Sequence, residues 1–166
     1  AYTNSVINTK QALICSSRPR RFGKSITADM LCAYYSRGCD SDSIFASYEI
    51  AKSDSYRKHL NQYDVIYLDI QWCMMDAGSA EQTVSYLNYH VIEELKEIYP
   101  QILLDGIRTA YGAMSCINAQ TGVKFIVIID EWDVLIRDEA ANEAVLQEYI
   151  NFLRGMFKGS EPTKFI

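Results

Sequence analysis

The sequence predicts an α/β fold in which helices cover a parallel sheet, and two observations lead to this prediction. Short apolar runs at 12–16, 64–70 and 125–129 have the length and composition of buried strands. Longer segments with helical spacing of apolar residues separate these runs, as the pairing of parallel strands requires. With 166 residues, the chain fits one domain over 1–166 with room for a hydrophobic core.

The first predicted strand leads through a loop at 17–24 into the first predicted helix. This helix begins near Lys24 and ends before Gly38. Its apolar residues recur at helical spacing: Ile26, Met30, Leu31 and Tyr34. Residues 37–63 are polar and mixed, so we expect loops with short helices there.

The second predicted strand is followed by an apolar run at 71–75, which we expect to be a loop at its carboxyl end. Ser79 and Gln82 then resemble a capping box that opens a helix. This helix stops before Pro100, and its apolar stripe consists of Val84, Leu87, Val91, Leu95 and Ile98. A further helix is expected over about 102–118.

In the last third of the chain we expect the strand at 125–129, a helix and the start of another strand. Asp138 is expected to cap a helix that continues to about Phe157. Its buried stripe consists of Val145, Tyr149, Leu153 and Met156, and Gly155 fits its end. Residues 163–166 resemble the first residues of a strand that is cut short. We therefore expect a C-terminally truncated sheet with an unpaired apolar edge, and self-association of the isolated chain.

The most informative motif is Gly23-Lys24-Ser25, which lies between a predicted strand and a predicted helix. This arrangement holds nucleotide phosphates, because the N–H groups of the loop and the helix N-terminus face the anion. Lys24 would bind the β- and γ-phosphates, and the Ser25 hydroxyl would ligate Mg²⁺. The general motif G-x-x-x-x-G-K-[ST] begins with glycine where this chain has Arg18, and Pro19 would stiffen that altered entry. The alternative is a polar turn that merely opens a helix.

We assign nucleotide binding to nine consecutive residues: Arg18, Pro19, Arg20, Arg21, Phe22, Gly23, Lys24, Ser25 and Ile26. The arginines of this run would contact phosphates, or they form a solvated charged loop. Contact with nucleic acid is the least supported interpretation, because the net charge is −5 and the pI is about 5.0.

A second motif follows the third predicted strand, where the apolar run ends in Asp130 and Glu131. Ligands of parallel α/β sheets bind beyond the carboxyl ends of the strands. Asp130 would hold Mg²⁺ through water beside Ser25, and Glu131 would orient and polarise the attacking water. Alternatively, both carboxylates only cap the strand. Asp69 ends the second strand in the same way, and it either faces the site from behind or caps the following loop.

These motifs resemble a bacterial family, the predicted AAA-ATPase-like proteins. The resemblance rests on SRPRRFGKS at 17–25, VIYLD at 65–69 and IIDEWD at 128–133. Members carry arginine where other phosphate loops begin with glycine. Their acidic motif resembles IDEYD, and this chain has Trp132 in place of its tyrosine. The resemblance spans about 12–166. Family members often carry a nuclease-like domain further on, and no such domain is visible in this sequence.

The resemblance implies a three-layer P-loop NTPase fold of the additional-strand type. It also implies Mg²⁺-dependent hydrolysis of ATP, with Lys24 and Glu131 as catalytic residues. A strand that continues from 163–166 would carry a polar residue that senses the γ-phosphate. An arginine finger would come from a partner subunit or from downstream sequence, with Arg137 a candidate only because it lies near the acidic motif.

Two other functions use the same residues. A nucleotide-gated module with little or no turnover would bind nucleotide in the same pocket, and its readout would be a partner protein. A nucleic-acid-binding module would use the basic loop and would bind in a salt-dependent manner without nucleotide.

Composition narrows the class of protein further. Hydrophobic residues make up 49% of the chain and charged residues 22%, as in ordinary globular domains. No signal peptide opens the chain and no apolar run reaches 18 residues, so we expect a cytoplasmic protein without a membrane partner. Five cysteines occur without a C-x-x-C pair and are expected to be buried thiols rather than a zinc site: Cys15, Cys32, Cys39, Cys73 and Cys116.

Overall fold

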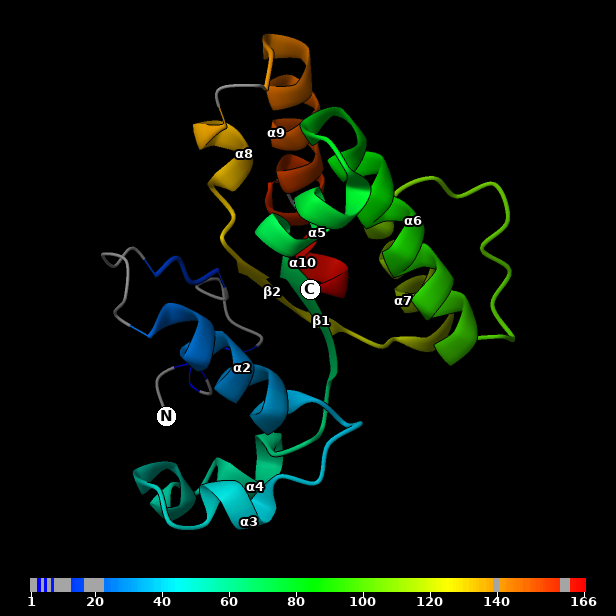
Figure 1. Cartoon of the computed structure of the whole chain (residues 1–166). Coiled ribbons are helices and arrows are strands. Elements are labelled where there is room, and N and C mark those ends of the chain that lie inside the picture. The colour runs from blue at the N-terminus through cyan, green and yellow to red at the C-terminus, as the bar shows by residue number, and fades with distance from the viewer. Residues whose placement is uncertain are drawn as a thin grey trace. The chain divides into compact units, whose positions relative to one another are not determined.

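The computed structural model describes residues 3, 5, 7, 13–16, 23–138, 141–158 and 162–166 (Figure 1). They form a mixed α/β structure that is mostly helical and contains a small parallel sheet of two strands. The chain groups into two compact units, residues 1–65 (unit 1) and residues 66–166 (unit 2). The expectation of a single domain stays a prediction. None of the described helices is both long and apolar enough to cross a membrane.

The described part of unit 1 is helical. Its elements are α2 (Lys24–Tyr35), α3 (Asp42–Phe45), the 3-10 helix η1 (Glu49–Lys52) and α4 (Tyr56–His59). The predicted first helix and the short helices over 37–63 are therefore confirmed.

The predicted first strand is wrong over residues 13–16, which have no regular structure; residue 12 lies outside the described residues. Leu13 and Ile14 are 58% and 49% exposed. An apolar run favours a strand, but only a hydrogen-bonded neighbour makes it one, and the sequence pattern does not specify that neighbour.

Asn61 fixes the C-terminal end of α2. Its side-chain amide donates to the carbonyls of Ala33 and Ser36, both at 2.9 Å, and its backbone N–H donates to the carbonyl of Tyr34 at 2.7 Å. These bonds satisfy carbonyls that the last turn of a helix leaves without partners. Asn61 reaches them from a left-handed backbone with φ 54°, a conformation that asparagine tolerates better than most residues.

Burial along α2 is confined to this C-terminal end. Tyr34 is buried and Leu31 half-buried, whereas Ile26 and Met30 are 66% and 40% exposed. Ile26 and Met30 therefore share the helical spacing of the apolar residues but not the burial of Tyr34. The helix is fixed at the end remote from Lys24, so its first turn does not take part in the core of unit 1.

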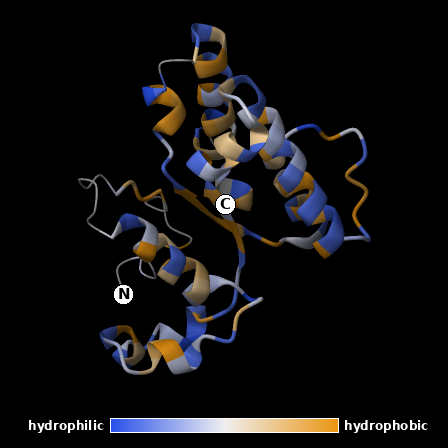
Figure 2. Ribbon diagram, viewed as in Figure 1, coloured by the Kyte–Doolittle hydropathy of each residue, from blue (hydrophilic) through white to orange (hydrophobic). Residues whose placement is uncertain are grey.

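Strand β1 (Asp64–Asp69) carries the chain from unit 1 into unit 2. The other elements of unit 2 are α5 (Ile70–Ala77), α6 (Ala80–Ile98), α7 (Ala110–Thr121), β2 (Phe125–Asp130), α8 (Val134–Arg137), α9 (Glu143–Phe157) and α10 (Pro162–Phe165). β1 and β2 pair in parallel, which confirms two of the predicted strands. Figure 2 shows β2 as hydrophobic along most of its length.

The core of unit 2 is built around α6, which packs against α5, α7 and α9 (Figure 1). The predicted stripe of α6 is buried at Val84, Leu87, Val91 and Leu95, but Ile98 is 60% exposed. α10 contacts α7 and α9, and α8 contacts α5 and α9. The segments that follow β1 and β2, α5 and α8, therefore lie against each other beyond the carboxyl ends of the strands.

The expected loop at 71–75 is wrong, because these residues lie within α5. The Asp69 carboxylate accepts the N–H of Trp72 at 3.0 Å, so a side-chain cap starts the helix directly after β1. Ser79 precedes α6 as predicted, but its side chain makes no capping hydrogen bond.

Caps also move the boundaries of the two later helices. The helix expected over 102–118 begins only after Thr109, whose hydroxyl accepts the N–H of Gly112 at 3.2 Å. The cap of α9 is Asn142 and not Asp138, because the Asn142 carboxamide accepts an N–H of the first turn at 3.1 Å. α8 is a separate short helix before it.

The expected strand at 163–166 is wrong, because Pro162–Phe165 form the helix α10. Proline suits the first position of a helix, and the Ile166 N–H donates to the Pro162 carbonyl at 2.9 Å. Phe165 is 3% exposed and belongs to the core of unit 2. The argument for self-association from an apolar edge at this position loses its basis, and self-association itself stays a prediction.

Gly155 lies inside α9 and not at its end as expected, and there it allows a close approach to α7. A Cβ added to Gly155 would lie 2.4 Å from a ring carbon of Tyr111, well inside contact distance. The glycine therefore serves packing between helices, at the cost of helix propensity.

We predict that Gly155→Ala destabilises unit 2 although alanine is the better helix former. Alanine should gain about 1 kcal/mol of helix propensity, but forcing its methyl against Tyr111 should cost about 1–3 kcal/mol. In a Tyr111→Ala background the same substitution should stabilise the protein by about 1 kcal/mol. Urea unfolding of the four proteins measures both effects, and stabilisation in both backgrounds would contradict the close contact.

Candidate functional site

The phosphate-loop motif is described only from Gly23 onward. The preceding candidate residues lie outside the described residues: Arg18, Pro19, Arg20, Arg21 and Phe22. Gly23 is the N-cap of α2 and has φ 72°, a left-handed conformation that glycine adopts without steric cost. Lys24, Ser25 and Ile26 form the first turn of α2; Lys24 is half-buried and the other two are exposed.

The N-terminus of α2 is suited to an anion. No side-chain hydrogen bond caps it within the described part of the chain, and no acidic residue lies in its first turn. The first N–H groups of a helix need acceptors from outside the helix, and the helix dipole favours negative charge there. A phosphate at this end would therefore meet donors that the helix itself leaves unsatisfied.

Asp130 ends β2 as a buried carboxylate, with 7% of the residue exposed. Its Oδ1 accepts the backbone N–H of Glu131 at 2.9 Å. Within the ranges that the structure describes, no other group donates to this side chain. One oxygen thus shapes the turn, and the other remains for a ligand.

Glu131 has a left-handed backbone with φ 49°, which is uncommon for a residue other than glycine. The turn that follows is closed by the Val134 N–H, which donates to the Glu131 carbonyl at 3.0 Å. It is also held from α9, where the Tyr149 hydroxyl donates to the Trp132 carbonyl at 2.6 Å. Tyr149 has no exposed surface, and burial raises the pKa of its hydroxyl, which therefore stays a donor at neutral pH.

Arg137 joins two carboxylates of this turn. Its Nε lies 2.9 Å from Asp133 Oδ2 and its Nη2 lies 3.2 Å from Asp133 Oδ1, a two-pronged contact. The same Nη2 lies 3.2 Å from Glu131 Oε2. The Glu131 side chain remains 27% exposed. It is therefore accessible to solvent while one of its oxygens is held.

Asp69 caps the helix α5, whereas the two interpretations of this residue expected it to face the site or to cap a loop. Its carboxylate is engaged with the Trp72 N–H. Asp130 and Asp69 end neighbouring parallel strands. Their hydrogen bonds differ: Asp69 starts a helix, whereas Asp130 shapes the turn that carries Glu131.

A sequence model of the family described as "Predicted AAA-ATPase" matches residues 1–164 of the chain. The chain belongs to this AAA-ATPase-like family. The resemblance to the family is thereby confirmed, while the assignment of its specific motifs and the bacterial origin stay predictions. No curated protein and no solved structure matches the chain significantly.

In this AAA-ATPase-like chain, Arg137 was expected only as a candidate arginine finger, and its contacts and that of Tyr149 with the acidic turn were missed. Asp133 and Arg137 are four residues apart, which is a recognisable signal for an ion pair on a short helix. Tyr149 carries no such signal, because a tyrosine in an apolar stripe indicates only a buried position. Its role appears only once α9 is packed beside the turn.

The cysteines do not form a buried set. Cys15 and Cys39 are exposed, so the expectation of buried thiols is wrong for these two, which lie in segments without helix or strand. Cys32, Cys73 and Cys116 are partly buried. A search of the described residues finds no group of three or more His, Cys, Asp or Glu side chains placed to hold a metal ion.

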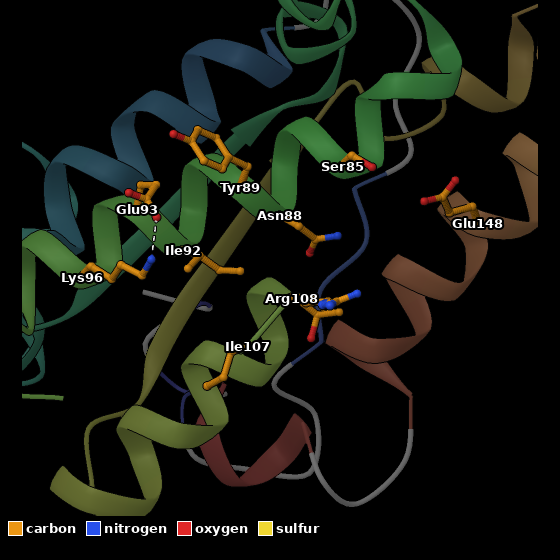
Figure 3. Close-up of a pocket in the computed structure, with 10 residues that line it drawn as sticks. Ser85, Asn88, Tyr89, Ile92, Glu93, Lys96, Ile107, Arg108 and Glu148 are labelled. Carbon is orange, nitrogen blue, oxygen red and sulfur yellow. Dashed lines mark hydrogen bonds and ion pairs between the residues drawn. The ribbon is translucent and has the colours of Figure 1, made fainter. Parts of the chain in front are cut away.

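Unit 2 also contains an open pocket of about 570 Å³ between α6 and the segment before α7 (Figure 3). Asp130 and Glu131 do not line it. Some of its polar groups are engaged: Lys96 pairs with Glu93 at 2.7 Å, and Asn88 accepts the N–H of Ala110 at 2.8 Å. The pocket therefore lacks the acidic pair that carries the chemistry of the candidate site.

We predict that Glu131→Gly is more stable to unfolding than Glu131→Ala by roughly 0.5–1 kcal/mol. A left-handed backbone costs an L-residue about 1–2 kcal/mol, and the extra chain entropy of glycine offsets part of that gain. Both variants lose the ion pair with Arg137, so that term cancels. Thermal or urea unfolding measures the difference, and an alanine variant as stable as the glycine variant would contradict the strained turn.

Proposed function

We propose that this chain binds ATP and hydrolyses it with Mg²⁺. Membership of the AAA-ATPase-like family supports the class of activity. The observation that carries the hydrolytic part is the acidic turn, in which buried Asp130 at the end of a parallel strand precedes Glu131 in a left-handed backbone. Ligands bind beyond the carboxyl ends of parallel strands, and strained backbone is concentrated at functional sites.

Nucleotide binding is proposed for the loop that ends at Gly23 and for the first turn of α2. The left-handed Gly23 and the helix end without a side-chain cap support this assignment. The ammonium group of Lys24 would bind the β- and γ-phosphates. For the whole chain we propose the three-layer P-loop fold of the additional-strand type.

The residues of the two motifs fit Mg²⁺. This ion prefers oxygen ligands and usually takes only one or two carboxylates, together with substrate phosphates and water. Asp130 offers a carboxylate oxygen, and Ser25 offers a hydroxyl on an exposed helix turn. When bound, Mg²⁺ would neutralise charge on the phosphate oxygens during transfer.

Glu131 would act on the attacking water. Its carboxylate is partly exposed, so a water molecule can reach it, whereas Asp130 is buried. The carboxylate would accept a hydrogen bond from the water and orient its oxygen toward the γ-phosphorus. Asp130 would thus bind the metal ion, and the neighbouring Glu131 would bind the attacking water.

We predict that Lys24→Ala weakens binding of Mg·ATP by on the order of 2 kcal/mol or more, because a charged partner of the phosphates is lost. Lys58→Ala, which removes an exposed lysine of α4 in the same unit, is the matched control and should bind as the parent does. Calorimetric titration with ATP, GTP and ADP measures the affinities. Parent-like affinity of Lys24→Ala would refute the phosphate-loop assignment.

We predict that Glu131→Gln keeps ATP binding but lowers hydrolysis by roughly 10²–10⁴-fold, because the amide lacks the carboxylate that polarises the attacking water. Asp130→Asn should weaken the dependence of turnover on Mg²⁺, and Asp69→Asn should do so less. Steady-state phosphate release at saturating ATP measures these effects. A parent that binds ATP without turnover would favour the nucleotide-gated module, and a stronger effect of Asp69→Asn would make Asp69 the metal-side carboxylate.

A further inference from the structure

Asp133 fixes the guanidinium group of Arg137, which also contacts Glu131. Asp133 lies one helical turn earlier and binds both Nε and Nη2, at 2.9 and 3.2 Å. A planar guanidinium held at two nitrogens has a defined direction, which an ammonium group would lack. The remaining contact of Nη2, to Glu131 Oε2 at 3.2 Å, therefore comes from a donor whose position Asp133 sets.

The side chain of Glu131 depends on this contact for its orientation. Its backbone is held by Asp130 and Val134, but these bonds restrain only the main chain. Among the described residues, Arg137 makes the only ion pair or side-chain hydrogen bond with the Glu131 carboxylate. The contact engages Oε2 and leaves Oε1 for another partner.

We propose that Arg137, anchored by Asp133, is a positioning residue that directs the Glu131 carboxylate toward the attacking water. This inference rests on the proposed ATP hydrolysis and assigns Arg137 a place within it. Misplacement of a reacting group by about 1 Å can cost a factor of about 100 in rate. Arg137 therefore acts on turnover through Glu131, without contact to the nucleotide.

Kinetics of a double-mutant cycle test the proposal. Arg137→Met should lower kcat roughly 10- to 100-fold and leave the Kd for Mg·ATP unchanged. Asp133→Asn should lower kcat less, because it loosens the anchor but keeps the arginine. In a Glu131→Gln background, Arg137→Met should have no further effect on kcat, since the group that it positions is already lost. Arg154→Met, an exposed arginine of α9 in unit 2, is the control and should behave as the parent.

Several outcomes would overturn the proposal. Weaker ATP binding in Arg137→Met, or the same loss of kcat in the Glu131→Gln background, would indicate that Arg137 contacts the nucleotide itself. A higher kcat in Arg137→Met would make the ion pair a brake on Glu131. An unchanged kcat would leave Arg137 without a role in turnover.

Absence of ATP hydrolysis by the parent would refute the proposed function. A second measurement tests the contacts of Arg137 in that case too. In urea unfolding, Arg137→Met and Glu131→Gln should be coupled by roughly 1.4- to 5-fold in the unfolding equilibrium constant, as for exposed ion pairs. That coupling should vanish in an Asp133→Asn background, because the anchor is gone. No coupling in the parent background, or equal coupling without Asp133, would refute the positioning role whether or not ATP is hydrolysed.

Discussion

The left-handed backbone at Glu131 is the constraint on which the candidate site depends. With φ 49° the residue costs the fold about 1–2 kcal/mol, so neighbouring groups must impose it. Asp130 accepts the Glu131 N–H, Val134 donates to its carbonyl, and Tyr149 holds the next carbonyl. The result is a sharp turn after β2 that carries a partly exposed carboxylate beside a buried one.

The acidic turn is held to the core of unit 2 by a residue of α9. Tyr149 has no exposed surface, and its hydroxyl is the point at which the packed helix meets the Trp132 carbonyl. Six residues further along α9, Gly155 lets the same helix approach Tyr111 of α7 closely. Packing between helices and the geometry of the acidic turn are therefore parts of one arrangement, and changes in α9 should reach Glu131 without touching it.

The sequence predicted what depends on composition and local pattern, and missed what depends on a cap or on a neighbour. Strand β2 and its acidic end were predicted because a continuous apolar run ended by Asp130 has few other interpretations. The helix after β1 was missed because it begins with a hydrogen bond from the Trp72 N–H to the Asp69 side chain. The apolar run at 71–75 does not indicate such a cap. The contact of Tyr149 with the acidic turn is set by tertiary packing, which a single sequence does not specify. The pair of Asp133 and Arg137 is local, and its four-residue spacing is visible in the sequence. The phosphate-loop assignment rests on its motif, on the geometry at Gly23 and on family membership.

The central proposal is that the motif at Ser25 and the acidic turn at Glu131 bind one nucleotide. Replacement of Mg²⁺ by paramagnetic Mn²⁺ tests it directly, because Mn²⁺ broadens the NMR signals of amides near the metal. Titration of ¹⁵N-labelled protein with Mn·ATP, against Mg·ATP as the diamagnetic reference, should broaden the amides of Ser25 and Glu131 together at the same nucleotide concentration. Broadening at only one of the two motifs would contradict a shared site.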